Sequence, residues 1–437
     1  MQISEMLEKI KKEKLISFHM PGHKGRVRYL DIKDDVTEFD GTDNLYDPKQ
    51  AILNTQLAIS KFYNSKKSYM GVNGSTGLIH VAINSAFNSE DKILIERSAH
   101  ISVFNATFFK RIDFDTFSSF EELEEIYNSK ASEYRGVIIT TPNVKGQIAD
   151  FSLIDKIRDK WIVIADEAHG ADLVISSREL SAINHADIVV HSFHKSLPAL
   201  TSSAVIHIYD KIDTYEVEKY LKIFQTTSPS YLILRSIDES IEFLSTKAEK
   251  EMEELLDNID NFLKRLEGTG FRRKIFKYYD RTRIFLEYKY PIDYRDVEIK
   301  LRDRSIQIEA SLSDGLVVLT SMLNQECDFI KLSDALIEID REVRKVEDIS
   351  INELKLLNVE KVLPFYRAYQ NRVNLVKQSE SVGKICSEIV TIYPPGVALI
   401  LPGERIKREH LDILEKFSDK VKLTECNYIS VVGDRDV

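Results

Sequence analysis

Nearly continuous apolar runs and helical stretches alternate between residues 50 and 210 of the chain. The stretch 150–159, for example, has helical spacing and lies between two apolar runs. Short apolar runs without alternating polar positions are typical of strands that are covered on both faces, as in a mainly parallel sheet. We expect strands at 93–96, 136–141, 161–168, 186–193 and 204–209. The pattern therefore predicts an α/β domain in which helices cover a mainly parallel sheet.

Farther along the chain, the pattern predicts one long helix and then a smaller α+β region. Apolar residues repeat at helical spacing through 236–267, and Gly268 is suited to end that helix. Beyond it we expect strands at 283–288 and 315–321, a helix at 331–344 and a boundary near 344–352. We divide the chain into an N-terminal arm, a large domain, a small α+β domain and a C-terminal domain, at 1–45, 46–268, 269–345 and 346–437.

Composition and charge narrow the class of protein. The 437 residues are 43% hydrophobic and 30% charged, which is typical of a globular protein with about two or three domains. The net charge of −10 argues against a nucleic acid partner, since phosphate binding needs a basic surface. Three widely spaced cysteines form no disulfide framework and fit a reducing compartment. No apolar run has the length of a signal-peptide core or a membrane span, so we expect a cytoplasmic protein without a membrane partner.

An aspartate and a lysine stand at the ends of two predicted strands. Asp166 ends the apolar run 161–166, and Lys195 lies in the segment 191–196 (HSFHKS), just past the next run. A lysine can form a Schiff base with pyridoxal phosphate (PLP), and a carboxylate can keep the pyridine nitrogen of that cofactor protonated. PLP needs these two protein groups to act as an electron sink. Either residue alone is common at a strand end, so the hypothesis depends on the residues around them.

A glycine-rich segment offers a place for a phosphate group. The segment 73–77 (NGSTG) precedes an apolar helix that begins near Leu78. Small residues let the backbone approach an anion, and a helix N-terminus supplies free N–H groups and a favourable dipole. Ser75 and Thr76 would add hydroxyl donors. An ordinary capped turn has the same pattern, and a nucleotide-binding phosphate loop is excluded because no Gly-Lys-Ser/Thr follows.

The segment 166–169 (DEAH) has the letters of helicase ATPases, in which the acidic residues serve Mg²⁺. Those enzymes also need a phosphate loop, and the chain has none. In a PLP site, Asp166 would pair with the ring nitrogen and His169 would lie beside the ring. In a purely structural role, Asp166 would cap a helix.

Other histidines lie near the same predicted sheet edge. His100 follows the strand 93–96, at the carboxyl end of the sheet where α/β proteins bind ligands, and an imidazole there can stack on a flat ring. A buried polar residue without a ligand is the alternative for His100. His191 and His194 have no Cys or Glu partner at the usual spacing of zinc ligands, so we expect no metal site.

Short motifs follow one another in a fixed order along nearly the whole chain. They are 18–26 (FHMPGHKGR), 40–45 (DGTDNL), 72–77 (VNGSTG), 97–102 (RSAHIS), 141–151 (TPNVKGQIADF), 166–172 (DEAHGAD), 191–196 (HSFHKS), 226–231 (TTSPSY), 381–388 (SVGKICSE) and 393–404 (YPPGVALILPGE). In this order they resemble the bacterial-type ornithine/lysine/arginine decarboxylases, which are PLP-dependent enzymes of fold type I, the aspartate aminotransferase fold. The resemblance implies a large α/β domain with a mainly parallel sheet and smaller α+β C-terminal regions, without the N-terminal wing of longer members.

The resemblance also implies a role for each matching residue. Lys195 would be the Schiff-base lysine and Asp166 the partner of the pyridine nitrogen, while His100 would stack on the ring and His169 would flank it. The phosphate would be bound by Ser75, Thr76, Ser192 and His194. Thr226 would reach the phosphate held by the partner subunit, which implies a homodimer with shared active sites. Glu388 would face the distal cation of the substrate, because a buried cation without a partner is unfavourable.

The implied reaction is the decarboxylation of a basic L-amino acid (lysine, arginine or ornithine) to CO₂ and cadaverine, agmatine or putrescine. One alternative is a fold-type-I aminotransferase, which would share Lys195 and Asp166 but would bind the substrate carboxylate with an arginine of the small domain. Another is a non-catalytic homologue that binds PLP or nothing. The chain departs from the family's usual residues at Ile101, Phe193 and Ala398, where a lysine, a small hydroxyl residue and a proline are common. These departures leave substrate choice and higher assembly open.

Overall fold

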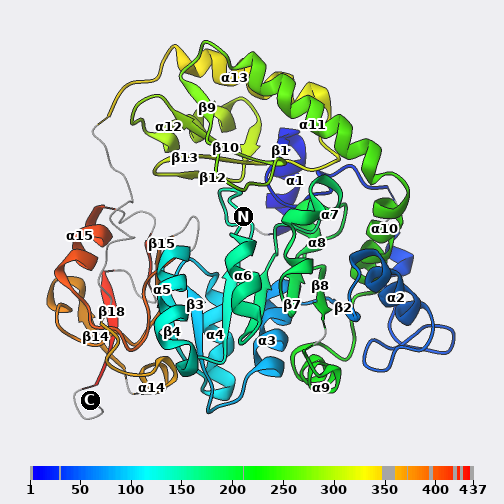
Figure 1. The fold of residues 1–437 in the computed structure, drawn as a ribbon. Coiled ribbons are helices and arrows are strands. Elements are labelled where there is room, and N and C mark those ends of the chain that lie inside the picture. Colours follow the sequence, from blue (N-terminus) through cyan, green and yellow to red (C-terminus); the bar gives the residue numbers. More distant parts are fainter. Residues whose placement is uncertain are drawn as a thin grey trace.

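The computed structural model describes residues 3–28, 31–209, 211–346, 360–371, 373–392, 397–416, 421–423 and 427–433. At its centre lies a seven-stranded sheet in the order β2-β8-β7-β6-β5-β3-β4 (Figure 1). The strand β8 is antiparallel to β2 and β7, and the remaining pairs are parallel. The strands are β2 Lys67–Gly71, β3 Lys92–Glu96, β4 Asp113–Phe117, β5 Gly136–Thr140, β6 Ile162–Asp166, β7 Ile188–His191 and β8 Ala204–Ile208. The prediction of a mainly parallel α/β sheet is confirmed.

The apolar runs predict the inner strands and miss two others. β3, β5, β6, β7 and β8 lie where the runs predict them, although β6 and β7 are shorter. The pattern does not predict β4, because this edge strand buries only Phe114 and Phe117. It does not predict β2 either, since that strand begins with the exposed Lys67 and the polar Ser68. Strands at the sheet's edges therefore lack the continuous apolar run of strands covered on both faces.

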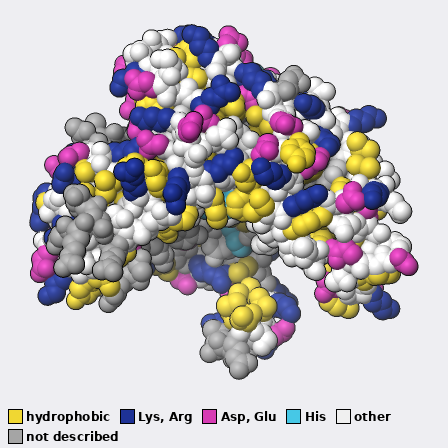
Figure 2. Space-filling view, turned by 90° about the horizontal axis from the view of Figure 1, so that it is seen from below, with side chains coloured by type: hydrophobic (Ala, Val, Ile, Leu, Met, Phe, Trp, Pro, Cys, Tyr) yellow, Lys and Arg dark blue, Asp and Glu magenta, His cyan; other side chains and the backbone are white. Residues whose placement is uncertain are grey.

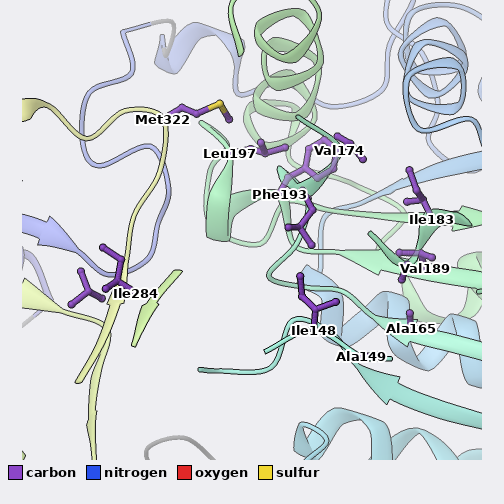
Figure 3. Close-up of a cluster of buried hydrophobic side chains, with 14 of the residues drawn as sticks. Ile148, Ala149, Ala165, Val174, Ile183, Val189, Phe193, Leu197, Ile284 and Met322 are labelled. Atoms are coloured by element: carbon purple, nitrogen blue, oxygen red, sulfur yellow. The ribbon is translucent and has the colours of Figure 1, made fainter. Parts of the chain in front are cut away.

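Successive side chains of β6 enter two different hydrophobic cores. Val163 and Ala165 face one core and Ile164 faces the other, and all three are fully buried. The first core continues from the sheet through Phe193 and Leu197 to Ile284 and Met322 (Figure 3). The segment that carries Lys195 is thus packed between the large sheet and the region beyond residue 268. The helices of this part are α2 Ala51–Tyr63, α3 Gly74–Ala86, α4 Ile101–Lys110, α5 Phe120–Lys130, α6 Phe151–Arg158, α7 Leu173–Ser176, α8 Phe193–Ser196 and α9 Thr214–Phe224.

The single long helix expected at 236–267 is wrong, because the structure has two helices there. α10 covers Tyr231–Thr246 and α11 covers Ala248–Arg265. Lys247, between them, has φ −126° and ψ −24°, which leaves the helical region. α10 packs on α2, whereas α11 packs on α13 Glu326–Asp340, so the chain must turn between the two surfaces. The apolar stripe continues through the turn, since Leu244 and Ala248 lie in the same core, and this continuity explains the prediction of one helix.

The region after α11 forms a small α+β unit. Its antiparallel sheet has the order β12-β13-β10-β9 and carries the helices α12 Tyr294–Asp303 and α13. The expected strand 283–288 is confirmed as β10, the strand 315–321 ends earlier, and the helix expected at 331–344 begins earlier. A capping box of Gln325 and Asp328 starts that helix, which the apolar spacing alone does not indicate. The strands are β9 Phe271–Arg273, β10 Arg283–Tyr288, β12 Ala310–Leu312 and β13 Gly315–Leu319.

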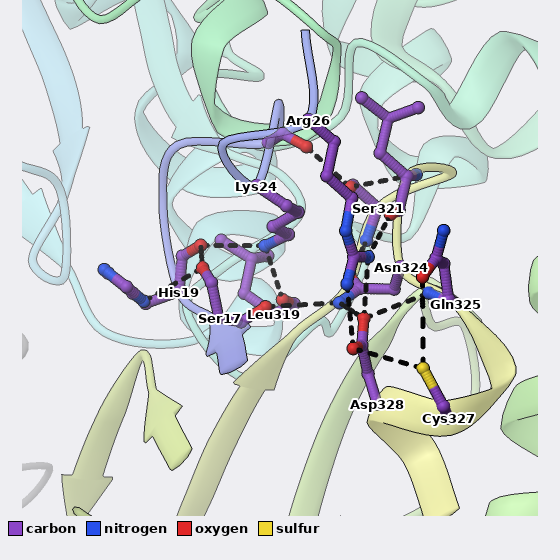
Figure 4. A network of polar contacts seen from close by, with 12 residues as sticks. Ser17, His19, Lys24, Arg26, Leu319, Ser321, Asn324, Gln325, Cys327 and Asp328 are labelled. Carbon is purple, nitrogen blue, oxygen red and sulfur yellow. Dashed lines mark hydrogen bonds and ion pairs between the residues drawn. The ribbon is translucent and has the colours of Figure 1, made fainter. Parts of the chain in front are cut away.

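The N-terminal segment connects this small unit to the large sheet. After α1 Ile3–Glu13, the strand β1 Ile16–Phe18 pairs in parallel with β11 Ile306–Ile308. We call residues 19–26 the arm. Lys24 Nζ donates to the carbonyl oxygens of His19 and Leu319 at 2.7 and 3.1 Å, and the Arg26 guanidinium forms two hydrogen bonds with the Asp328 carboxylate at 2.7 and 2.9 Å (Figure 4). The arm is therefore fixed on the small unit by partly buried polar contacts.

The last described residues form a unit with its own core, which we call the C-terminal unit (residues 360–433). It lies beside β4 and α4, and α14 contacts both (Figure 1). Its elements are α14 Phe365–Gln370, β14 Val373–Lys377, β15 Val390–Ile392, β16 Val397–Ile400, α15 Arg408–Lys416, β17 Val421–Lys422 and β18 Tyr428–Val432. The expected boundary near 345 stays a prediction, because residues 347–359 lie outside the described residues, as does the turn 393–396.

Short 3₁₀ helices complete the described elements, at Ile32–Asp34, Ala131–Glu133, Arg178–Leu180, Ala182–Asn184 and Gln378–Glu380. Of the helices that the structure describes, none has both the length and the apolar content of a membrane span.

Candidate active site

Lys195 lies on α8, the short helix that follows β7. Its Nζ atom is 2.9 Å from Nε2 of His169. Burial lowers the pKa of Lys195 below its usual value, and the charge of Asp166 opposes this effect. A lysine with a reduced proton affinity is the better nucleophile toward a carbonyl group. Next to it, Phe193 is fully buried and packs on Tyr63 with ring centroids 6.1 Å apart, so this departure from the family fills core space.

Asp166 is the last residue of β6 and is only 5% exposed. It is in register with Thr140 on β5 and Val190 on β7, and its Oδ1 atom accepts a hydrogen bond from the Ala168 N–H at 3.2 Å. The carboxylate lies at the carboxyl end of the central strands, where parallel sheets bind ligands. Its charge acts on Lys195, so the structure brings these two predicted residues together.

His100 caps the N-terminus of α4, at the end of the loop that follows β3. Its Nδ1 atom accepts from the Ser102 N–H at 3.2 Å and lies 2.8 Å from Ser102 Oγ, which leaves Nε2 and the ring face free of those bonds. Burial lowers the pKa of His100, while the Asp166 carboxylate opposes the shift. His100 therefore belongs to the same electrostatic site as Asp166 and Lys195. The departure Ile101 is the first residue of α4 and is half-buried.

His169 is a neutral neighbour of Lys195. Burial lowers its pKa well below the usual value, and the positive charges of Arg283 and Lys195 lower it further. Because the imidazole is neutral, Nε2 accepts a hydrogen from Lys195 Nζ and the ring proton is on Nδ1. That Nδ1 atom is buried and has no hydrogen-bond partner among the described residues. The ring thus offers a donor to a group that would bind beside Lys195.

Arg283 is a residue of this site that the sequence analysis missed. It begins β10 in the small unit, is 2% exposed, and donates to the carbonyl oxygens of His169 and Asn143 at 3.2 and 3.3 Å. Its Nε atom is buried without a partner in the described part of the chain. Gly146, at φ +82°, lies against it, and a Cβ there would be 3.0 Å from the arginine Cβ. A charged residue directly before the apolar run 284–286 was the available signal.

The predicted phosphate ligands come from segments that touch one another. The Gly74 N–H, at the start of α3, donates to the Ser202 carbonyl oxygen at 2.8 Å, and His194 Nδ1 lies 3.0 Å from the Ser203 carbonyl oxygen. Ser75 and Thr76 occupy the first turn of α3, half-buried and exposed.

Buried hydroxyl groups near these segments test whether the residues fit a phosphate. Ser192 and Ser203 are fully buried, and neither Oγ atom has a hydrogen-bond partner among the described residues. Buried polar atoms without partners are costly unless a ligand completes them. Together with the N-terminus of α3 and His169 Nδ1, these donors fit an anionic, aromatic cofactor of the kind predicted from the sequence.

Two predicted residues lie outside this cluster. Thr226 is exposed, and its Oγ1 atom accepts a hydrogen bond from the Ser228 N–H at 3.2 Å. The side-chain oxygen of the preceding Gln225 accepts from the Val72 N–H of its own chain at 3.1 Å. Glu388 is buried in the C-terminal unit, where its Oε1 atom accepts from the Ser430 N–H at 2.6 Å. The roles of Thr226 toward a partner subunit and of Glu388 toward a substrate stay predictions.

Comparison with solved structures identifies the class of the fold. The chain is similar to the constitutive lysine decarboxylase of E. coli (TM-score 0.76, 17% identity, 91% of this chain and 75% of that chain). It is similar to the lysine decarboxylase of Francisella novicida (TM-score 0.75, 17% identity, 89% of this chain and 73% of that chain). A structure described as SPT with PLP matches less of it (TM-score 0.56, 16% identity, 66% of this chain and 76% of that chain). The fold is that of PLP-dependent enzymes of fold type I, as the resemblance implied.

Family models identify the chain more closely. The model of the Orn/Lys/Arg decarboxylase major domain matches residues 3–113 and 108–285, and that of the Orn/Lys/Arg decarboxylase C-terminal domain matches residues 350–422. The chain belongs to the Orn/Lys/Arg decarboxylase family and is a decarboxylase. Two relatives named arginine decarboxylase cover 92% of this chain: that of Bacillus subtilis is 26% identical over 448 residues, covering 91% of that protein, and that of Bacillus anthracis is 24% identical over 448 residues, covering 90%.

Proposed function

We propose that the chain uses PLP to decarboxylate a basic L-amino acid. The observation that carries the proposal is the position of Lys195, whose Nζ atom is 2.9 Å from His169 Nε2 and within the field of Asp166, at the carboxyl ends of β6 and β7. When bound, PLP would supply an electron sink for the pair released as the carboxylate leaves. Among this chain's residues, Lys195 would bind the cofactor covalently and Asp166 would hold the proton of its ring nitrogen.

Other residues of the site would orient and retain the cofactor. His100 would lie against the ring, and His169 would flank it and accept a hydrogen from Lys195 at Nε2. The phosphate would be held by the N-terminus of α3, with Ser75, Thr76, Ser192 and His194. Decarboxylation then requires that a proton be delivered to the substrate Cα, and Lys195 Nζ is the group whose reduced pKa suits that transfer.

The substrate belongs to the family's class of basic amino acids. Relatives that match along about nine-tenths of the chain are named arginine decarboxylase, so we place L-arginine first, ahead of L-lysine and L-ornithine. The distal cation of such a substrate requires a carboxylate in the assembled site. Glu388 is our candidate for that carboxylate, and Glu388→Gln should raise KM for the substrate much more than it changes the affinity for PLP.

A second candidate is an aminotransferase, and Arg283 is the observation that favours it. A buried guanidinium from the small unit lies beside His169, with its Nε atom unpartnered among the described residues. Such a group could bind a substrate carboxylate firmly, which a decarboxylase does not need. The two hydrogen bonds given for the Arg283 side chain are to backbone carbonyl oxygens, however, which is consistent with a structural role. Membership of the decarboxylase family favours the first function.

Product analysis separates the two functions. The purified protein, supplied with PLP, is incubated with L-arginine, L-lysine or L-ornithine, and the products are identified by mass spectrometry. We expect CO₂ with agmatine as the main product, and no product from a Lys195→Ala variant. An oxo acid together with pyridoxamine phosphate would establish the aminotransferase instead, and the absence of product from all three substrates would contradict both.

We further propose a cytoplasmic homodimer in which Thr226 completes the partner's phosphate site. Several large hydrophobic side chains remain exposed, among them Ile32 (78%), Phe39 (61%) and Leu57 (57%), and Figure 2 shows hydrophobic side chains around a hollowed face. Mixing Lys195→Ala with Thr226→Ala subunits, each inactive alone, should restore activity, since one site of each mixed dimer is intact. No rescue after proven subunit exchange would contradict the shared site.

A further inference from the structure

A buried ion pair connects the C-terminal unit to the loop that carries His100. Both terminal nitrogens of Arg97 contact the Glu404 carboxylate, one of them at 2.9 Å from Oε2. The same guanidinium donates to the Leu399 carbonyl oxygen at 2.9 Å, and the Leu401 N–H donates to Glu404 Oε2 at 2.8 Å. The two side chains are 12% and 5% exposed. Both charges are therefore largely removed from water and depend on each other.

Arg97 and His100 belong to one short, tightly held turn. Arg97 follows the end of β3, and its N–H donates to the Phe117 carbonyl oxygen at 2.8 Å. The Ala99 N–H donates to the Glu96 carbonyl oxygen at 2.9 Å, and Ser98 Oγ donates to the Glu96 carboxylate at 2.6 Å. His100 then caps α4. A displacement of Arg97 would consequently be transmitted to the His100 ring over only a few constrained residues.

The C-terminal unit also packs on the helix that His100 begins. Phe365 of α14 lies 5.6 Å from Phe114, and Tyr369 lies 5.5 Å from Phe108 of α4, between ring centroids. Ala398 and Leu401, on either side of the Leu399 carbonyl, are buried in the same core as α4. The ion pair and the apolar contact thus hold α4 and the preceding loop from one side.

We propose that Glu404 and Arg97 are positioning residues of the active site, through which the C-terminal unit holds the His100 ring where a cofactor would stack. The hydrogen bonds of the Arg97 and Glu404 side chains given above do not involve Lys195 or His169. The inference rests on the proposed function for the identity of the stacked ring, but the immobilisation of His100 is independent of it. By this proposal, the C-terminal unit supports the active site of its own chain.

Lys361 provides a matched control, because its side chain forms another charged bridge between the same two regions while its backbone pairs with Glu404. Its Nζ atom contacts the carboxylates of Asp113 and Asp115 on β4 at 2.6 and 3.2 Å. It is 28% exposed and does not contact the loop 97–100 in the described structure. Lys361→Gln therefore removes a charge bridge of the C-terminal unit without removing the proposed support of His100.

The first measurement uses the protein without cofactor. Diethyl pyrocarbonate modifies exposed, neutral imidazoles, and peptide mapping by mass spectrometry gives the rate at His100. His100 is exposed, so the reagent reaches Nε2 in the unmodified protein, and release of Nδ1 from the Ser102 N–H would add a second reactive nitrogen. We therefore expect Glu404→Gln to raise the rate by about threefold and Lys361→Gln to leave it unchanged, with Arg97→Lys intermediate. Denaturation curves establish that each variant is folded. If Glu404→Gln does not fold, Arg97→Lys carries the comparison.

The second measurement is the affinity for PLP, by fluorescence titration, in a double-mutant cycle with His100→Ala. Glu404→Gln should weaken binding about tenfold when His100 is present and less than about twofold when it is absent. Equal effects of Glu404→Gln in both backgrounds, or rates at His100 that match those of Lys361→Gln, would overturn the proposal. Absence of PLP binding by the unmodified protein would instead overturn the proposed function, while the modification rates would still decide whether Glu404 immobilises His100.

Discussion

The arm and the C-terminal unit come from opposite ends of the chain. Both reach the carboxyl ends of the central strands, but they do so through different kinds of contact. In the arm, the Gly22 N–H donates to the His194 carbonyl oxygen at 2.7 Å, and the Gly22 carbonyl accepts from Ser321 Oγ at 2.7 Å. The C-terminal unit instead approaches through the Arg97–Glu404 ion pair. One contact is backbone against backbone, and the other is charge against charge.

This difference decides which changes each contact can tolerate. At Gly22, a Cβ would be 2.7 Å from the Leu197 carbonyl oxygen, so any side chain displaces the backbone next to Lys195. At Arg97 and Glu404, a change in side-chain shape should be tolerated better than the loss of one charge, because an unpaired buried charge is costly. The arm therefore constrains the lysine side of the site by close packing, and the C-terminal unit constrains the His100 side by electrostatics.

The largest effect is expected at Asp166, whose charge acts on both His100 and Lys195. Asp166→Asn keeps the size of the side chain but removes the charge that would hold the cofactor nitrogen protonated. We expect kcat to fall by a factor of about 10³ with PLP still bound and the fold intact, since removing one such electrostatic group typically costs two to three orders of magnitude. Steady-state kinetics and absorbance spectra measure this, and near-normal turnover would show that Asp166 is structural.

The next effect tests the backbone contact of the arm. Gly22→Ala should lower the free energy of unfolding by about 3 kcal/mol and slow the reaction, because the new methyl group meets backbone atoms that cannot move aside. Gly25→Ala is the control: φ is +73° there, but nothing lies within 4 Å of the added Cβ, so only about 1 kcal/mol of conformational cost is expected. Urea denaturation compares the two, and equal losses would refute the close-packing account.

The ion pair between Arg26 and Asp328 adds a pH dependence to the arm. Burial alone would raise the pKa of Asp328, but hydrogen bonds from Arg26 and the Gln325 N–H lower it below the usual value. A carboxyl group whose pKa is lowered by folding stabilises the fold above its unfolded pKa, about 4, and loses this contribution as the pH falls through the lowered value.

Arg26→Ala should therefore cost about 2 kcal/mol at neutral pH, less than a fully buried pair because Arg26 is 32% exposed. The difference from the unmodified protein should shrink as the pH falls below about 4. Denaturant midpoints across this range measure it, and a difference that grows in acid would contradict the assignment.

The smallest effect is expected from the Lys361 bridge of the C-terminal unit, because its aspartate partners are 38% and 34% exposed, whereas Asp328 is 4% exposed. Lys361→Gln removes contacts to Asp113 and Asp115 that remain partly in water. Exposed ion pairs contribute little, so we expect a loss of about 0.5 kcal/mol, reduced further in high salt, with activity unchanged. A loss as large as that caused by Glu404→Gln would show that any bridge to the C-terminal unit serves equally well, and the comparison would fail.

The sequence predicts the part of the fold that is buried on both faces and loses accuracy elsewhere. β6 and β7 carry continuous apolar runs because neighbouring side chains enter different cores. The edge strand β4 lacks such a run. The pattern also does not predict the turn at Lys247, because the apolar stripe continues through it.

The candidate site divides in the same way. Lys195, Asp166 and His169 were predictable, because they stand at strand ends within short motifs. Arg283 lies in none of these motifs, and the motif 393–404 that ends at Glu404 does not indicate its partner, since each residue meets its partners only through the packing of segments far apart in the chain. A single sequence contains many charged residues and does not indicate which of them become buried together.

The most direct test of the central claim is the chemical identification of the residue that binds the cofactor. The protein is incubated with PLP, reduced with borohydride and digested, and the pyridoxyl group is located by peptide mass spectrometry. The account predicts a single adduct on Lys195, in the peptide that contains His191–Ser196, and no adduct in Lys195→Ala. An adduct on Lys145 or another lysine, or none in the unmodified protein, would contradict it.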